Sequence, residues 1–145
     1  MKLLISLLFV TVIFSSCQKV PSQELPSSLF KPYSKEAVAA SIAQHKPVVI
    51  DFWADWCPNC HDLEREVFSR PEIQAQLAQL TTLRVDATDQ YNDKVQELTQ
   101  QYNIEGLPTV VFLDSHGKEI KDARVIGFVT ADDFKQALAM VKVLK

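Results

Sequence analysis

Two cysteines, Cys57 and Cys60, stand where an apolar run meets a helical pattern, and this junction constrains the chain more than any other feature. The apolar residues 48–50 predict a buried strand, and residues 61–68 have the spacing of a helix. We therefore expect both cysteines on the first turn of that helix, with Pro58 at its first position. The positive end of a helix favours a thiolate over a thiol, and Cys60 can reach back to Cys57 to close a disulfide.

The residues around this pair resemble those of the thioredoxin family. The shared pattern is a strand ending Asp51-Phe52-Trp53, followed by Trp56-Cys57-Pro58-Asn59-Cys60. The likeness is closer to one branch, the C-terminal periplasmic domain of the membrane reductant conductor DsbD, through Ala54-Asp55-Trp56-Cys57, Glu64, Gly106-Leu107-Pro108-Thr109 and Ala123-Arg124-Val125-Ile126-Gly127-Phe128. The resemblance begins at about residue 30. It implies an α/β thioredoxin fold, with a central mixed β-sheet flanked by helices, over residues 29–145.

Periodicity and turn residues predict strands and helices that alternate along this domain. Strands are expected at 29–32, 47–54, 82–86 and 109–113, with a last one within 120–126. Helices are expected at 34–45, 58–68, 72–80 and 92–102, and a final helix follows Thr130, which caps it as Ser34 caps the first.

Composition limits the function classes. The net charge is −3 and no basic run occurs, which excludes a nucleic-acid-binding surface of the usual kind. A structural zinc site needs four ligands, whereas the chain has one CxxC and three histidines without ligand spacing, so no metal is expected. A purely structural CxxC bridge would close a very small loop and stabilise little. Thiol–disulfide exchange is therefore the expected role of the cysteine pair, and it needs no dissolved cofactor.

The N-terminus reads as an export signal. Lys2 precedes an almost wholly apolar stretch, residues 3–14, and Ser15-Ser16-Cys17 resembles a bacterial lipobox. We expect a signal peptide over 1–16, a lipid on Cys17 and a flexible tether over 17–28. Gln18 then favours the outer membrane, on the periplasmic side of the cell envelope. The alternatives are an uncleaved anchor, or a plain secretory signal that leaves a soluble periplasmic protein.

Two acids are expected near the cysteines. Asp51 ends the apolar strand, and the resemblance places the matching acid beneath the second cysteine, where it helps to move a proton. The alternative is an acid at a strand end that reaches water. Glu64 lies one turn after Cys60 on the apolar stripe of the helix. It forms either a coupled pair with Asp51 or an ion pair with a base at the helix rim.

The remaining site residues concern partner binding. The resemblance implies a cis Leu107–Pro108 bond that faces the cysteines, with Thr109 following it. The alternative for Pro108 is an ordinary turn proline. Partner contacts are also expected from the segment Trp56-Cys57-Pro58-Asn59, with Trp56 shielding the sulfurs. Trp53 is expected in the core, and His61 on an exposed helix surface.

Together these features predict an extracytoplasmic thiol–disulfide oxidoreductase in which Cys57 attacks and Cys60 resolves. In the favoured reading it reduces disulfides in exported proteins, and a membrane thiol reductant of the DsbD type supplies its electrons. Two alternatives remain open. One is a disulfide oxidase or isomerase; the other is a redox-linked binding or assembly module of the cytochrome c maturation or chaperone type.

Overall fold

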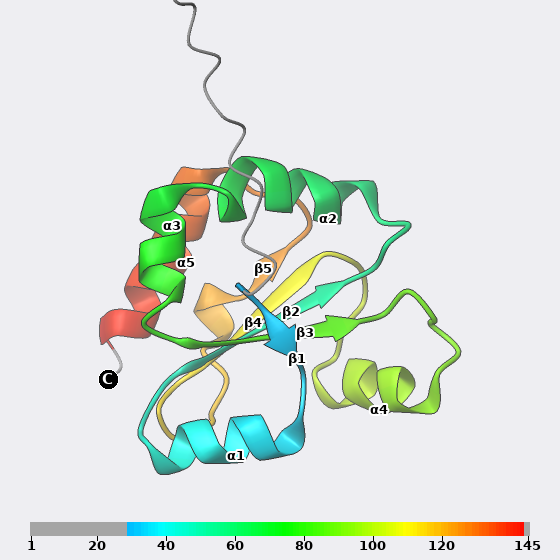
Figure 1. Ribbon diagram of the computed structural model, residues 1–145, viewed down its shortest axis with the longest axis horizontal. Coiled ribbons are helices and arrows are strands. Elements are labelled where there is room, and N and C mark those ends of the chain that lie inside the picture. Colours follow the sequence, from blue (N-terminus) through cyan, green and yellow to red (C-terminus); the bar gives the residue numbers. More distant parts are fainter. Residues whose placement is uncertain (1–28, 144–145) are drawn as a thin grey trace, which may run out of the picture.

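The computed structural model describes residues 29–143, which form a five-stranded sheet with helices on both faces (Figure 1). The elements in chain order are β1 (Lys31–Pro32), α1 (Lys35–Ala43), β2 (Val48–Trp53), α2 (Pro58–Leu63), η1 (Glu64–Phe68), α3 (Pro71–Leu77), β3 (Thr81–Asp86), α4 (Asp93–Gln101), β4 (Thr109–Leu113), η2 (Lys121–Ala123), β5 (Val125–Ile126) and α5 (Ala131–Val143). The predicted signal peptide (1–16), Cys17 and the tether (17–28) lie outside the described residues. Within the described part of the chain, no helix is long and apolar enough to span a membrane.

The strands lie across the sheet in the order β1-β3-β2-β4-β5. The first three are parallel, whereas β4 is antiparallel to β2 and β5 is antiparallel to β4. The central strand β2 is hydrogen-bonded along both edges, and five of its six residues are buried. A strand covered on both faces requires the near-continuous apolar run that the sequence has there. The predicted α/β architecture with a central mixed sheet is confirmed.

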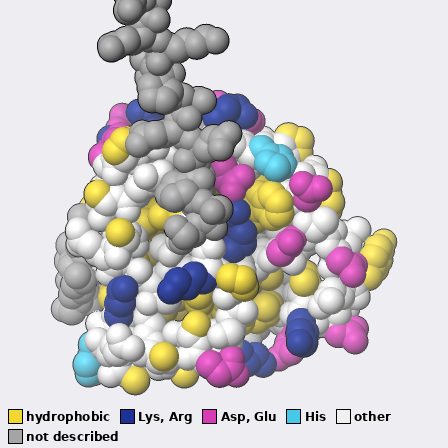
Figure 2. Space-filling model, viewed as in Figure 1, with side chains coloured by type: hydrophobic (Ala, Val, Ile, Leu, Met, Phe, Trp, Pro, Cys, Tyr) yellow, Lys and Arg dark blue, Asp and Glu magenta, His cyan; other side chains and the backbone are white. Residues whose placement is uncertain are grey.

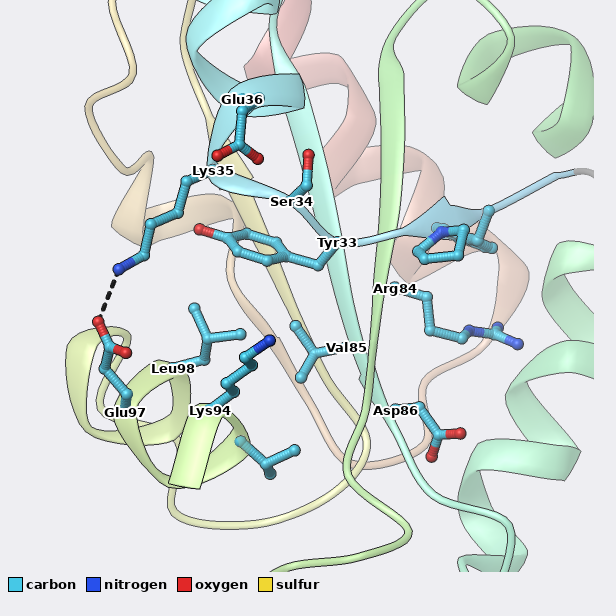
Figure 3. Close-up of a pocket in the computed structure, with 13 residues that line it drawn as sticks. Tyr33, Ser34, Lys35, Glu36, Arg84, Val85, Asp86, Lys94, Glu97 and Leu98 are labelled. Atoms are coloured by element: carbon cyan, nitrogen blue, oxygen red, sulfur yellow. Dashed lines mark hydrogen bonds and ion pairs between the residues drawn. The ribbon is translucent and has the colours of Figure 1, made fainter. Parts of the chain in front are cut away.

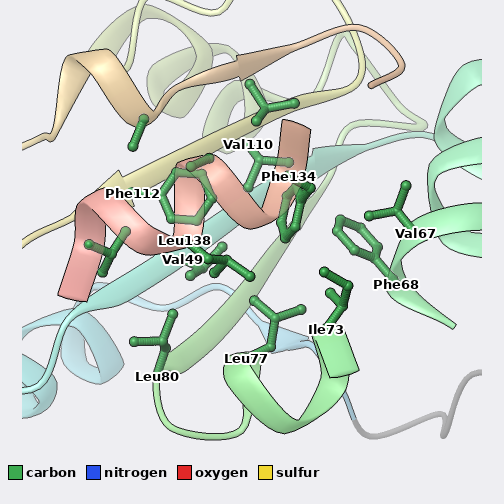
Figure 4. Packing of buried hydrophobic residues seen from close by; sticks show 14 of the residues in the cluster. Val49, Val67, Phe68, Ile73, Leu77, Leu80, Val110, Phe112, Phe134 and Leu138 are labelled. Atoms are coloured by element: carbon green, nitrogen blue, oxygen red, sulfur yellow. The ribbon is translucent and has the colours of Figure 1, made fainter. Parts of the chain in front are cut away.

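Side chains of β2 alternate between the two faces of the sheet. One set packs toward α1 and α4, and consists of Val48, Ile50 and Phe52. Val49 packs on the opposite face with residues from α2, η1, α3 and α5, among them Leu63, Phe68, Leu77, Phe134 and Leu138 (Figure 4). Asp51 falls on the same side as Val49 by this alternation. It therefore faces the layer that contains the cysteine-bearing helix.

The helix starts follow from side-chain caps. Ser34 Oγ accepts a hydrogen bond of 3.0 Å from the Ala37 N–H at the start of α1, and Asn92 Oδ1 accepts one of 3.0 Å from the Lys94 N–H at the start of α4. At α5, Thr130 Oγ1 accepts from the Asp133 N–H, while the Asp133 carboxylate accepts from the Thr130 N–H. Each cap satisfies backbone donors that a helix leaves free at its N-terminus. The predicted starts at Ser34 and Thr130 are confirmed.

One predicted helix differs in the structure. The single helix expected over 58–68 is α2 followed by the π-helical turn η1, in which the Ser69 N–H donates to the Glu64 carbonyl five residues earlier, at 3.0 Å. The wider turn allows two consecutive side chains, Val67 and Phe68, to be buried. The last strand lies within 120–126 as expected: it is β5, which follows η2.

On the face of the molecule shown in Figure 2, basic and acidic side chains are interspersed over the surface.

Candidate functional site

The cysteine pair occupies the N-terminus of α2. Cys57 is the N-cap residue, with an extended backbone, and Pro58 takes the first helical position. The two cysteines form a disulfide with their Cα atoms 5.3 Å apart, and Cys57 Sγ accepts a hydrogen bond of 3.2 Å from the Cys60 N–H. A sulfur that receives a backbone N–H at a helix start is stabilised when it carries negative charge. This arrangement favours release of Cys57 as a thiolate when the disulfide is reduced.

Both cysteines are covered by the protein. Cys57 is 4% exposed and Cys60 is 1% exposed, and the partly buried side chains that pack against them are Trp53 and Leu107. Trp53 was expected in the core, but it is only partly buried because it lies at the C-terminal end of β2. Cys57 is the slightly more exposed residue of the two, which suits the attacking role.

A proline loop lies against this cluster. The Leu107–Pro108 peptide bond is cis, and Leu107 contacts the cysteine cluster. Thr109 is buried, and its hydroxyl donates to the Gly106 carbonyl at 2.7 Å. The Pro108 carbonyl accepts from the Gly127 N–H at 2.8 Å. One bond lies within the loop and the other joins it to Gly127. Together they fix the position of the proline loop beside the CxxC.

A groove of about 470 Å³ begins at this loop. Its lining includes Trp56, Val95, Ile104, Glu105 and Leu107. The Trp56 side chain is 56% exposed, and its indole N–H donates to the Thr88 carbonyl at 3.0 Å. An anchored, exposed aromatic ring beside the cysteines offers an apolar contact to a protein partner.

Asp51 is buried on β2, with 1% of its surface exposed. Burial raises the pKa of this carboxyl group from 3.8 to about 6, because the charged form loses its hydration. The positive charge of Arg84 opposes the increase, and the negative charge of Glu64 adds to it. Asp51 therefore changes its protonation state near neutral pH, which is the range a proton-transfer group requires.

The two acids share a cation, Arg84 of β3, which is the register partner of Asp51 in the sheet. Arg84 Nε donates to Asp51 Oδ2 at 2.9 Å, and Nη1 donates to Glu64 Oε1 at 2.6 Å. Nη2 lies 2.7 Å from the same Asp51 oxygen, as an ionic contact without hydrogen-bond geometry. One positive charge therefore lies between the two carboxylates.

Glu64 forms the ion pair with a base that was one of its two expected roles. Its side chain is 23% exposed, so it sits at the rim of the helix, and its ion pair with Arg84 links it to buried Asp51. On its outer side, Glu64 Oε2 lies 3.8 Å from His61 Nδ1. His61 is 44% exposed, as expected, and its Nε2 is 2.7 Å from the Asp55 carbonyl oxygen.

A larger cavity of about 700 Å³ lies away from the cysteines (Figure 3). It is lined by β1, the start of α1, β3 and α4, and the Lys35–Glu97 ion pair of 2.6 Å joins the two helices at its side. Neither cysteine lines it. Cavity size therefore does not identify the redox centre of this molecule; the cysteine geometry does.

Residues 34–142 match the family model described as a thioredoxin-like domain. The chain belongs to this thioredoxin-like family. The match covers most of the chain and includes the cysteine pair, the cis-proline and both acids. A thioredoxin-like domain whose cysteine pair closes a disulfide has the features of a thiol–disulfide oxidoreductase.

Relatives extend this result. The chain is 42% identical over 94 residues to the "Thiol:disulfide interchange protein DsbD" of Photorhabdus laumondii, covering 65% of this chain and 16% of that protein. It is 45% identical over 103 residues to the protein of that name from Yersinia pestis, covering 71% and 17%. The chain thus spans about a sixth of the length of these curated relatives.

Solved structures agree on the fold. The oxidised C-terminal domain of DsbD from Neisseria meningitidis aligns with a TM-score of 0.64 at 28% identity, over 77% of this chain and 92% of that domain. A thioredoxin from Thermus thermophilus aligns with a TM-score of 0.66 at 29% identity, over 79% and 86%. The resemblance read from the sequence, to thioredoxin and to the DsbD C-terminal domain, is confirmed.

The thioredoxin-like domain brings most of the predicted site residues together. Cys57, Cys60 and Leu107 form one cluster, while Pro58 and Asn59 are exposed on the first turn of α2. Sequence reasoning missed Arg84. A buried acid in a central strand needs a cation nearby, and a basic residue inside the adjacent strand β3 was the signal available for it.

Proposed function

We propose that this thioredoxin-like domain is a disulfide reductase of the cell envelope. It reduces disulfides in exported proteins, or in another redox protein, and a membrane thiol partner of the DsbD type reduces it in turn. The observation that carries the proposal is the Cys57–Cys60 disulfide at the start of α2, packed against the Leu107 side chain of the cis-proline loop. The relatives are named thiol:disulfide interchange proteins, which supports the same chemistry.

The reaction transfers two electrons in two displacement steps. The Cys57 thiolate attacks one sulfur of the partner's disulfide; the partner's S–S bond breaks and its other sulfur leaves as a thiolate. Cys60 then gives its proton to the Asp51 carboxylate, and its sulfur attacks Cys57 Sγ. The mixed disulfide breaks, the partner's second sulfur leaves as a thiolate, and the Cys57–Cys60 disulfide forms.

The two partner thiolates take up two protons, one of which Asp51 supplies directly or through water. Asp51 suits this task because burial raises its pKa to about 6, so both protonation states are accessible near neutral pH. The exposed Trp56 ring and the groove beside it would receive an extended segment of the partner. Pro58 and Asn59, exposed beside the cysteines, would add partner contacts, whereas Thr109 is buried and would act through its bond to the Gly106 carbonyl.

The proposal includes a location. A signal peptide over 1–16, a lipid on Cys17 and a tether over 17–28 would hold the domain at the periplasmic side of a membrane, where exported disulfides occur. The apolar run ending in Ser15-Ser16-Cys17 supports this, and Gln18 favours the outer membrane.

The reduction potential tests the direction of electron flow. The full chain in detergent is equilibrated in thiol–disulfide buffers, and the fraction of Cys57–Cys60 disulfide is measured by alkylation and mass spectrometry. A value near the ~−270 mV of thioredoxin supports a reductase, whereas one near the ~−120 mV of DsbA overturns that direction and favours an oxidase. A Cys57→Ser/Cys60→Ser variant that retained full cellular activity would favour a binding or assembly module.

A further inference from the structure

The guanidinium group of Arg84 contacts two carboxylates and lies over two aromatic rings. Along its edges it contacts Asp51 Oδ2 and Glu64 Oε1. Arg84 Cζ lies 5.0 Å from the centre of the Phe30 ring and 5.2 Å from the centre of the Trp53 ring. Aromatic rings attract a cation and exclude water from it, which strengthens its interaction with neighbouring charges. The Arg84 side chain is consequently only 21% exposed.

Because Arg84 contacts only one of the two carboxylate oxygens of Asp51, the oxygens differ in their hydrogen bonding. Oδ2 receives both contacts from Arg84, whereas Oδ1 is buried without a hydrogen-bond partner. A buried carboxylate oxygen without a donor is costly, and a proton removes that cost by neutralising the group. A proton on Oδ2 would instead compete with the Arg84 N–H groups for the same oxygen. Oδ1 is therefore the atom on which the proton belongs.

We propose that Arg84 is a positioning residue that fixes the Asp51 carboxyl group with Oδ1 as its proton-carrying oxygen, and that Glu64 acts on Asp51 by sharing this cation. The inference deepens the proposed function, on which the proton-transfer role of Asp51 rests. It also assigns Glu64 a role without requiring it to touch a sulfur atom.

The groups that act on Asp51 come from four elements. β3 contributes Arg84, and the α2–η1 segment contributes Glu64, which His61 approaches from the solvent side. In the proposed function, α2 also brings the Cys60 thiol to this carboxyl group. β4 presents the apolar Val110 at the register position of Asp51. Among the described residues that act on this carboxyl group, Arg84 is therefore the one positive charge in direct contact.

Arg84 and Glu64 must therefore act on Asp51 in opposite directions. Loss of the cation removes an attraction that stabilises the Asp51 carboxylate, so the pKa of Asp51 rises. Loss of the Glu64 charge removes a repulsion, and Arg84 then pairs with Asp51 alone. The pKa of Asp51 therefore falls. A Glu64 that belonged only to the helix rim would leave this pKa unchanged.

The test is the pKa of Asp51 from carboxyl-carbon NMR titration of the oxidised full chain, with Asp51→Asn identifying the resonance. Arg84→Met should raise the pKa by about one to three units, the range for removing a close opposite charge. Arg84→Lys, which keeps the charge but cannot contact both acids as a planar fork, should raise it less. Glu64→Gln should lower it. The control Arg65→Met removes an exposed arginine that pairs with Asp62 and Glu66, and should leave it unchanged.

An infrared measurement addresses the proton position. If Oδ1 carries the proton, Oδ2 is the C=O oxygen and accepts from Arg84, so the C=O stretch of protonated Asp51 lies at low frequency and rises in Arg84→Lys and Arg84→Met. A stretch that does not move overturns the assignment of Oδ1. If Arg84→Met does not fold, Arg84→Lys and Glu64→Gln still decide the matter.

An Asp51 pKa that stays constant or rises in Glu64→Gln overturns the sharing of Arg84. None of these readouts uses catalysis. If they behave as expected while Asp51→Asn reduces a partner disulfide at the parent rate, the Arg84 inference stands and the proton step of the proposed function fails.

Discussion

Replacing Asp51 with Asn should stabilise the oxidised protein at neutral pH. Burial raises the pKa of Asp51 from 3.8 to about 6, so above pH 6 folding must bury a carboxylate that is better solvated in the unfolded chain. The difference of about two units corresponds to about 3 kcal/mol, at ~1.4 kcal/mol per unit. Asn has nearly the same shape and its carbonyl oxygen can still accept from Arg84, so the substitution removes the charge with little change in packing.

The sign of the pH dependence follows from proton binding. Between pH 3.8 and about 6 the folded chain binds more protons at Asp51 than the unfolded chain does, so the stability of the parent falls as pH rises through this window. Asn does not titrate. The gain from Asp51→Asn should therefore be near zero at pH 3.5, grow between pH 4 and 6, and level off at about 3 kcal/mol above pH 7.

Urea unfolding of the full chain without reductant measures this difference, with the free energy of unfolding of parent and variant compared at pH 3.5, 5 and 7.5. Asp122→Asn, which neutralises an exposed carboxyl group, serves as the control and should change the free energy little at every pH. A gain from Asp51→Asn that is the same at all three pH values, or a loss at pH 7.5, would refute the reasoning, because neither is linked to titration of a buried acid.

Three further outcomes are expected. Cys60→Ser should trap a mixed disulfide with a partner at Cys57, seen by mass spectrometry of the non-reduced adduct; a requirement for Cys60 in the first attack would contradict the assignment. Phe134→Ala should lower the free energy of unfolding by about 3–5 kcal/mol, because this fully buried ring packs 5.3 Å from Phe68 and 5.9 Å from Phe112 between ring centres; Met140→Ala at a partly exposed position of the same helix is the control. Mass spectrometry of membrane-extracted protein should find Cys17 acylated as the N-terminal residue, and a soluble chain beginning elsewhere would contradict this.

Local residue chemistry was sufficient to predict the elements and the reacting atoms. Ser34 and Thr130 start helices because their hydroxyl groups replace hydrogen bonds that a helix cannot make at its own end. The CxxC spacing placed Cys57 and Cys60 on one helical turn, and the apolar run before them required a buried central strand. These properties depend on a few neighbouring residues, so they are readable along the chain.

The electrostatics of the site depended on contacts between distant segments. Arg84 lies 33 residues after Asp51 in the chain, and it reaches that acid only because β2 and β3 pair in the register that aligns them. The π-helical turn likewise depends on the packing of Phe68 against Phe30 and Phe134. The sequence by itself determined the fold class and the cysteine chemistry. Only the tertiary structure decided how the two acids are balanced, because charge interactions act through space and depend on which strands pair.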